Sequence, residues 1–335
     1  MAAQWTATTG EPWCAPKFVC SGVQSRSLTR VRQHRGAKAA GLGAKGPVVN
    51  DIQPAKRVDS HHHFWDPAIR EYSWMPDALR RPYRPADLRP LLATNAMEAT
   101  VLVQTVCDVR ETLEFLQIAS ETDFVAGVIG WVDLTDIQTA HVLNELRASE
   151  HGKYLVGIRH QVHDEDDPEW LLRENVQTNF EALADQGLVY DILVRTRELP
   201  AAVTVARDFP HLKFVIDHIA KPPIASGGID EWSALMHEFA GLEHVACKLS
   251  GMVTEADHES WTTDDLKPYI STVFEIFGPD RLMFGSDWPV CTLAASYDEV
   301  VHALRTVLIE LGALDEVTEA AIFGNTAIHW YGLTV

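Results

Sequence analysis

Short apolar runs rich in β-branched residues recur eight times along this chain, and longer amphipathic stretches separate them. Most of these runs are hydrophobic throughout rather than alternating, which is typical of parallel strands that are covered on both faces. Because parallel strands need long crossover connections, eight strands joined by helices predict an α/β fold, the (β/α)8 TIM barrel. The predicted strands cover residues 57–61, 100–105, 125–132, 155–159, 188–194, 213–217, 244–249 and 281–285.

Helical patterns occupy most of the connections between these strands, and several of them end at a glycine, a frequent helix stop. One connection differs. Residues 65–92 are rich in Pro, Arg and Trp, and we expect them to form a long loop over the mouth of the barrel. The predicted helices cover residues 111–120, 139–149, 170–186, 199–208, 231–241, 264–277 and 296–311.

The first 50 residues differ in composition from the rest of the chain. They contain seven basic residues and one acidic residue, whereas the remainder has 21 basic and 46 acidic residues. They also lack strand or helix periodicity, so little apolar surface could be buried to offset the entropy of ordering. We therefore predict a disordered basic extension over residues 1–56 and a barrel over residues 57–335. A plain tail, a misassigned start and an organelle transit peptide all share this composition.

The net charge of −19 at pH 7 limits the partners that the chain can bind. Nucleic acids and anionic membranes would be repelled, which leaves a small molecule as the expected partner. No apolar run approaches the ~18 residues that a membrane span needs. Five scattered cysteines without CxxC spacing favour a reducing compartment. We expect the cytoplasm, or a mitochondrion or plastid if residues 1–50 are a transit peptide, and a homodimer is kept open as the assembly.

Polar side chains gather where the predicted strands end. In a (β/α)8 barrel the chemistry takes place at the carboxyl ends of the strands, so these residues are the candidates for a site. Five of the eight strands deliver an ionisable residue there, and ionisable groups that face a cleft need a function or a partner. The candidates are His61, His63, Gln104, Arg159, His160, Asp217, His218, Lys221, Lys248, Ser250, Asp287 and Trp288.

His61 and His63 are two residues apart on the first predicted strand, so both imidazoles lie on one face and point to the same region. Such spacing suits metal binding or proton transfer, although a histidine-rich turn on the surface would have the same sequence. Arg159 and His160 are adjacent, so they cannot both point inward if the strand continues through them. His160 could then be a buried histidine with a structural partner.

Three other candidates also have structural interpretations. Asp217 could orient a neighbour or cap the following segment, and Lys221, which precedes two prolines, could be a solvated turn lysine. Trp288 could pack in the barrel mouth instead of contacting a substrate. The case for a site therefore depends on the whole set of strand-end residues and not on any one of them.

Four motifs contain nine of these twelve candidates: VDSHHHFW at 58–65, GIRH at 157–160, FVIDHIAKP at 214–222 and RLMFGSDWP at 281–289. Together, from residue 57 to residue 333, they resemble the amidohydrolase superfamily, and more narrowly its sugar-lactone hydrolases, which include L-fuconolactonase and L-rhamnonolactonase. In that superfamily a (β/α)8 barrel holds metal through the histidine pair of strand 1 and the aspartate of strand 8. The resemblance implies His61, His63 and Asp287 as metal ligands, with Asp287 also accepting a proton.

The chain departs from the superfamily pattern for two metal ions. Strand 4 ends in Arg159 and His160 where a bridging Lys or Glu would stand, and the predicted strand 188–194 ends without a histidine. We therefore expect at most one divalent ion, with zinc as a candidate and His218 as a fourth ligand. The pyrone-dicarboxylate lactonases resemble this set of residues and work without metal, so metal-independent catalysis stays open.

The chemistry that fits is the opening of a sugar lactone by water. Attack on the ring carbonyl needs a base for the water, an electrophile near the carbonyl oxygen and an acid for the leaving alkoxide. We expect Asp287 to be the general base and His218 to be a second catalytic residue. Two alternatives remain: a metal-dependent decarboxylase of an aromatic or unsaturated acid, and a non-catalytic binding barrel. The predicted substrate contacts are Gln104, Arg159, His160, Lys221 and Trp288.

Overall fold

The computed structural model describes residues 56–335, so the extension predicted for residues 1–56 lies outside the described part, Lys56 excepted. Eight parallel strands form one sheet in which each strand pairs with the next along the chain. The (β/α)8 prediction is confirmed. The strands are β1 (Val58–His62), β2 (Ala99–Val103), β3 (Val125–Gly130), β4 (Leu155–Gln161), β5 (Val189–Leu193), β6 (Phe214–Ile216), β7 (Val245–Leu249) and β8 (Leu282–Phe284).

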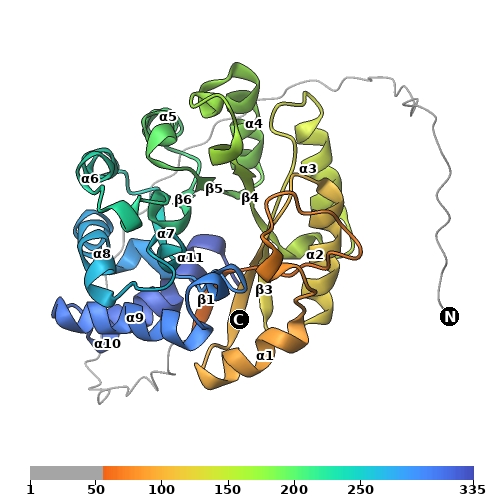
Figure 1. The fold of residues 1–335 in the computed structure, drawn as a ribbon. Coiled ribbons are helices and arrows are strands. Elements are labelled where there is room, and N and C mark those ends of the chain that lie inside the picture. Colours follow the sequence, from red (N-terminus) through yellow and green to blue (C-terminus); the bar gives the residue numbers. More distant parts are fainter. Residues whose placement is uncertain (1–55) are drawn as a thin grey trace, which may run out of the picture. The chain divides into compact units, whose positions relative to one another are not determined.

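Helices surround the strands, from α1 in orange through green α4 and α5 to blue α9 in Figure 1. Among residues 56–335, none of them is both long and apolar enough to cross a membrane. The helices are α1 (Pro85–Thr94), α2 (Val109–Glu121), α3 (Thr139–Ala148), α4 (Glu174–Asp185), α5 (Leu199–Asp208), α6 (Asp230–His237), α7 (Met252–Glu255), α8 (Thr263–Phe277), α9 (Tyr297–Glu310), α10 (Glu316–Ala320) and α11 (Thr326–Tyr331).

The sheet closes where β8 meets β1. The Ser60 hydroxyl donates to the carbonyl oxygen of Phe284 over 2.7 Å, and a parallel bridge joins His62 to Trp288 just beyond the end of β8. The backbone N–H of Asp287 also donates to the carbonyl of His61 over 2.8 Å. These contacts bring the first and eighth strands together, so the motif residues at the two ends of the barrel sequence become neighbours.

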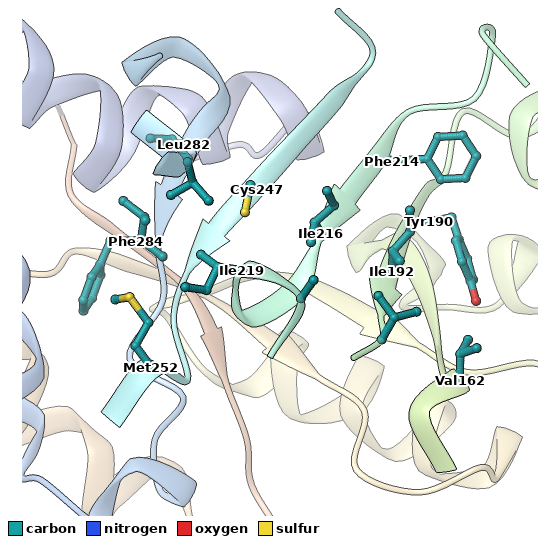
Figure 2. Packing of buried hydrophobic residues seen from close by; sticks show 14 of the residues in the cluster. Val162, Tyr190, Ile192, Phe214, Ile216, Ile219, Cys247, Met252, Leu282 and Phe284 are labelled. Atoms are coloured by element: carbon teal, nitrogen blue, oxygen red, sulfur yellow. The ribbon is translucent and has the colours of Figure 1, made fainter. Parts of the chain in front are cut away.

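Alternate side chains of each strand point outward against the helices. Figure 2 shows four of them, Tyr190 and Ile192 of β5 and Phe214 and Ile216 of β6, which pack side by side in the buried layer. Their neighbours along the strands point into the barrel, as expected from the period of two. Burial of one large apolar side chain contributes about 1.5–3 kcal/mol, so this layer accounts for much of the folding free energy.

A second apolar cluster fills one end of the barrel interior. The strands contribute small and branched side chains to it, and α11 with the residues after it covers them from below. Trp330 and Tyr331 thus close the end of the barrel opposite the candidate site. The members are Val58, Ala99, Val101, Val103, Ile129, Val189, Val215, Ala246, Met283, Ala327, Trp330, Tyr331 and Leu333.

The prediction of one long loop over residues 65–92 was partly wrong, because α1 occupies its last part. Pro85 stands at the first helical position, where its missing N–H costs nothing, and the Asp87 carboxylate accepts the backbone N–H of Arg84 over 2.9 Å. The earlier part does form a loop at the barrel mouth. Its Trp74 indole donates to the carbonyl of Thr105 over 2.9 Å, which fixes the loop to the end of β2.

Candidate active site

The carboxyl ends of the strands surround a cavity of about 500 Å³. Five residues singled out from the sequence reach its wall: His63, Arg159, His218, Lys221 and Asp287. The remaining lining combines charged and apolar side chains, a mixture suited to a polar small molecule. These further lining residues are Trp74, Pro76, Thr105, Gln161, His163, Asp164, Leu193, Arg195, Val290 and Leu293.

His61, His63 and Asp287 converge at the bottom of this cavity. The two Nε2 atoms of His61 and His63 lie 3.3 Å apart, and the Asp287 carboxylate oxygen is 3.4 Å from His63 Nε2 and 3.8 Å from His61 Nε2. His63 Nδ1 is 2.7 Å from the carbonyl oxygen of Val103. A carbonyl only accepts, so Nδ1 carries a hydrogen, and Nε2 is the ring nitrogen that faces His61 and Asp287.

This geometry fits one divalent metal ion. An ion held tetrahedrally by bonds of about 2.1 Å keeps its ligand atoms about 3.4 Å apart, close to the separations of the three residues. A second cluster, His61 with Asp217 and His218, also lies within ligand distance. Asp217, however, already accepts from Arg159 over 2.9 Å and pairs with the Lys248 ammonium over 3.0 Å. The cluster with Asp287 is therefore the better candidate for a metal.

Asp287 is held in an unusual backbone conformation, with a φ of 56°. It follows Ser286, whose N–H and hydroxyl donate to the buried Asp59 carboxylate over 2.9 and 2.6 Å. Burial alone would raise the pKa of Asp287, but the neighbouring His218 and His63 outweigh that effect and the pKa lies below its usual value. The side chain is therefore an ionised carboxylate at neutral pH, able to accept a proton.

His218 approaches Asp287 from the end of β6. The backbone from His218 to Lys221 has positive φ angles, and the helical turn that contains most of it begins at Asp217, the last residue of the predicted strand 213–217. His218 Nδ1 is 2.9 Å from the Ser250 hydroxyl, and its Nε2 is 3.9 Å from the Asp287 carboxylate. Burial lowers the pKa of His218 to about 4, so the imidazole is neutral at neutral pH.

Gly251 makes room for this imidazole. Its φ of 64° favours glycine, and a Cβ atom there would lie 2.5 Å from His218 Nδ1, well inside contact distance. The position of His218 therefore depends on Gly251, which directly follows Ser250, the residue that is hydrogen-bonded to the imidazole ring.

Arg159 lies almost fully buried beneath the cavity, and all five of its N–H groups have partners. Its Nε and Nη2 donate to the side-chain oxygen of Gln104, and Nη2 also donates to the Gln104 carbonyl. Nη1 donates to Asp217 over 2.9 Å and to His61 Nε2 over 3.2 Å. Gln104, predicted as a substrate contact, is fully buried and instead fixes the arginine.

Below the cavity lies a layer of buried charged side chains. Sequence reasoning did not identify these side chains as one connected group. Lys248 lies 2.6 Å from Asp191 and 3.0 Å from Asp217, and the Tyr331 hydroxyl donates to Asp191 over 3.0 Å. Burial raises the pKa of Asp191 to about 6 although Lys248 opposes the shift. One signal was available: Asp191 is an acid inside an apolar strand, and a buried charge needs a partner.

His160 points away from the cavity, as its position beside the inward-facing Arg159 requires. Its Nδ1 accepts the Trp131 indole N–H over 3.0 Å, its Nε2 is 2.8 Å from Glu165, and its ring stacks on Trp170 at 4.1 Å. The structure thus places His160, a predicted substrate contact, outside the cavity lining, where both of its ring nitrogens have hydrogen-bond partners.

Two other predicted substrate contacts differ in position. Trp288 is buried, and its ring packs edge to face against Tyr83 at 5.3 Å, away from the cavity lining. Lys221 does line the cavity, where it forms an ion pair with Glu255. The lysine is therefore available near the site, whereas the tryptophan supports the loop beside it.

Arg195 and His163 line the cavity but were not predicted from the sequence. Arg195 comes two residues after β5, and a search that extended beyond the strand ends would have found it. His163 lies in a short turn after β4. Burial lowers its pKa to about 3, so His163 is neutral and Arg195 supplies charge at this wall.

Residues 58–333 match the amidohydrolase family. The chain is 38% identical to an L-fucono-1,5-lactonase of Burkholderia ambifaria over 282 residues, which are 82% of this chain and 95% of the relative. It is also 38% identical to an L-fucono-1,5-lactonase of Burkholderia multivorans, over 83% of this chain and 97% of the relative.

A solved structure shares both the fold and much of the sequence. It is a crystal structure of an amidohydrolase from Burkholderia multivorans with bound zinc, 36% identical, with a TM-score of 0.78. The match covers 84% of this chain and all of that chain. A more distant relative is an L-rhamnono-gamma-lactonase of Scheffersomyces stipitis, 24% identical over 56% of this chain and 62% of the relative.

Proposed function

The chain belongs to the amidohydrolase family, and from this premise we propose that it is a hydrolase that opens the ring ester of a sugar lactone. One observation carries the proposal. An ionised Asp287 and the neutral imidazole of His218 face a cavity that also contains Arg195 and Lys221. A base, hydrogen-bonding groups and fixed cations are the parts that ester hydrolysis requires.

In the proposed mechanism Asp287 is the general base. Its carboxylate accepts a proton from a water molecule as the oxygen attacks the ring carbonyl and a tetrahedral intermediate forms. The ring C–O bond then breaks, and Asp287 returns the proton to the leaving ring oxygen. The product is a hydroxy acid, which releases one proton into neutral solution. The neutral His218 is oriented by Ser250 and can hold the water or the leaving oxygen by a hydrogen bond.

Fixed positive charges on the other wall favour the developing oxyanion. Arg195 and Lys221 reach the cavity, so their cationic side chains can stabilise negative charge on the carbonyl oxygen and then on the product carboxylate. Arg159 adds a third charge below them. Attraction of the product carboxylate by these cations would also slow product release.

The substrate that we propose is a deoxy-sugar lactone similar to L-fucono-1,5-lactone, the substrate in the names of the relatives. Hydroxyl groups would bond to polar side chains such as Gln161 and Asp164. Leu193, Val290 and Leu293 provide an apolar part of the same wall, where a methyl group of such a sugar could lie.

A single divalent ion, with zinc as the candidate, would be held by His61, His63 and Asp287. When bound, such an ion polarises a carbonyl oxygen and lowers the pKa of water. The residues fit the ion by distance, and the related amidohydrolase with bound zinc supports the choice of metal.

The test is a screen of aldonolactones with a pH indicator, because each hydrolysis releases one proton. We expect L-fucono-1,5-lactone or a related deoxy-sugar lactone to be hydrolysed well above the spontaneous rate, and Asp287→Asn to return the rate to that background. Release of carbon dioxide from aromatic acids, without lactone hydrolysis, would favour a decarboxylase and contradict the proposal.

A further inference from the structure

The Arg159 guanidinium and a metal ion would need the same lone pair. Arginine can only donate, so the 3.2 Å contact from Arg159 Nη1 makes His61 Nε2 the acceptor. His61 Nδ1 then carries the proton and lies 3.3 Å from both the Asp217 carboxylate and the Lys248 ammonium, of which only the carboxylate can accept it. His61 Nε2 is also the atom that lies with His63 and Asp287 at ligand distances. An N–H donor and a metal cannot share this lone pair.

Arg159 cannot easily move aside. Its five N–H groups bond to Gln104, Asp217 and His61, and the residue is 3% exposed. Rotation away from His61 would break at least one charge-assisted hydrogen bond in a buried site. An ion that did bind would stand beside a permanent positive charge at low dielectric, where repulsion is strong.

We infer that Arg159 is a built-in competitor for the metal site: its guanidinium occupies the lone pair of His61 and keeps divalent ions weakly bound. The ligand set His61, His63 and Asp287 is complete by distance, so the weak affinity comes from the adjacent cation and not from a missing ligand. The inference concerns the same cavity as the proposed hydrolysis but uses no turnover, so either can fail alone.

The main experiment measures zinc affinity of the metal-free protein by competition with a chromophoric chelator. Arg159→Met removes the charge and the donors at similar length, and we expect it to bind zinc roughly tenfold or more tightly than the wild type. Arg159→Lys is the matched control that keeps a positive charge, and it should bind as weakly as the wild type. Equal affinities of wild type and Arg159→Met, or a tight Arg159→Lys, would overturn the inference.

Two further measurements test whether the zinc is held at this site and whether Arg159 is the cause of the weak binding. Asp287→Asn in the Arg159→Met protein should abolish the gain in affinity, and a gain that persists would place the ion elsewhere and contradict the inference. If Arg159→Met does not fold, as judged by circular dichroism, Gln104→Met decides instead. That change removes the side-chain oxygen that anchors Nε and Nη2, so the freed arginine should allow tighter zinc binding; an unchanged affinity would count against the competition.

Discussion

Replacing Lys248 by Met should lower the free energy of unfolding by about 3–5 kcal/mol, because it removes the cation between two buried carboxylates. Lys248, Asp191 and Asp217 are all fully buried, and the ammonium lies 2.6 and 3.0 Å from the two acids. Methionine has a similar volume, so the loss reports on charge rather than on a cavity. Against a typical total of about 5–15 kcal/mol, this is a large fraction of the stability.

The loss should also depend on pH. In the wild type, burial would raise the pKa of Asp217, but Lys248 and its neighbours hold the pKa well below its usual value of 3.8. That carboxyl therefore stabilises the fold above pH 3.8, and the contribution is lost as the pH falls through the folded pKa. Without Lys248, the pKa of Asp191, which burial already raises to about 6, should rise further, and stability then falls more as the pH rises from about 4 toward that folded pKa.

Urea unfolding at about pH 5 and about pH 8 measures both effects. The deficit of Lys248→Met should be larger at the higher pH. Adding Asp191→Asn to Lys248→Met should recover at least about 1 kcal/mol, since one uncompensated charge is removed. A loss below about 1 kcal/mol, or equal losses at the two pH values, would refute the assignment of Lys248 as the counter-ion of this layer.

Three other predictions concern the cavity. Asp287→Asn should lower kcat by about 10²–10⁴-fold without a change in melting temperature, and a variant that keeps most of its activity would exclude Asp287 as the base. The value of kcat/KM should be constant from about pH 6 to 8, should fall toward pH 4, where the neutral His218 becomes protonated, and should fall further below pH 3.8, where Asp287 does; a pH–rate profile with an inflection near 7 would contradict these pKa assignments. Gly251→Ala should destabilise the fold by about 1–3 kcal/mol and lower kcat, measured by thermal unfolding and steady-state kinetics, whereas an unchanged kcat would show that His218 tolerates displacement.

Much of the barrel could be predicted because local patterns determine it. Runs of buried β-branched residues mark the strands, and the rule that barrel chemistry lies at strand ends found His61, His63, His218 and Asp287 before their contacts were known. The helix α1 was missed because Pro85 and Pro90 look like helix breakers, although a proline at the first helical position favours a helix start.

The remaining features depend on contacts between distant parts of the chain. Tyr331 and Asp191 are 140 residues apart, so no local pattern connects them. The same holds for Gln104 and Arg159, where the sequence suggested two substrate contacts and the structure shows one residue anchoring the other. Which side chain reaches the cavity and which supports it is decided by packing across the barrel.

The position of Tyr331 has a consequence for how the protein is made. By the time residue 325 has been synthesised, all eight strands and every residue that lines the cavity have left the peptidyl transferase centre. The end of the barrel is still open at that stage, however, and Asp191 lacks the hydroxyl that bonds to its carboxylate. A nascent chain released at this point would contain every residue that lines the cavity but would lack the helix that covers the opposite end of the barrel. Completion of the charged layer therefore waits for α11, which is synthesised after every residue that lines the cavity.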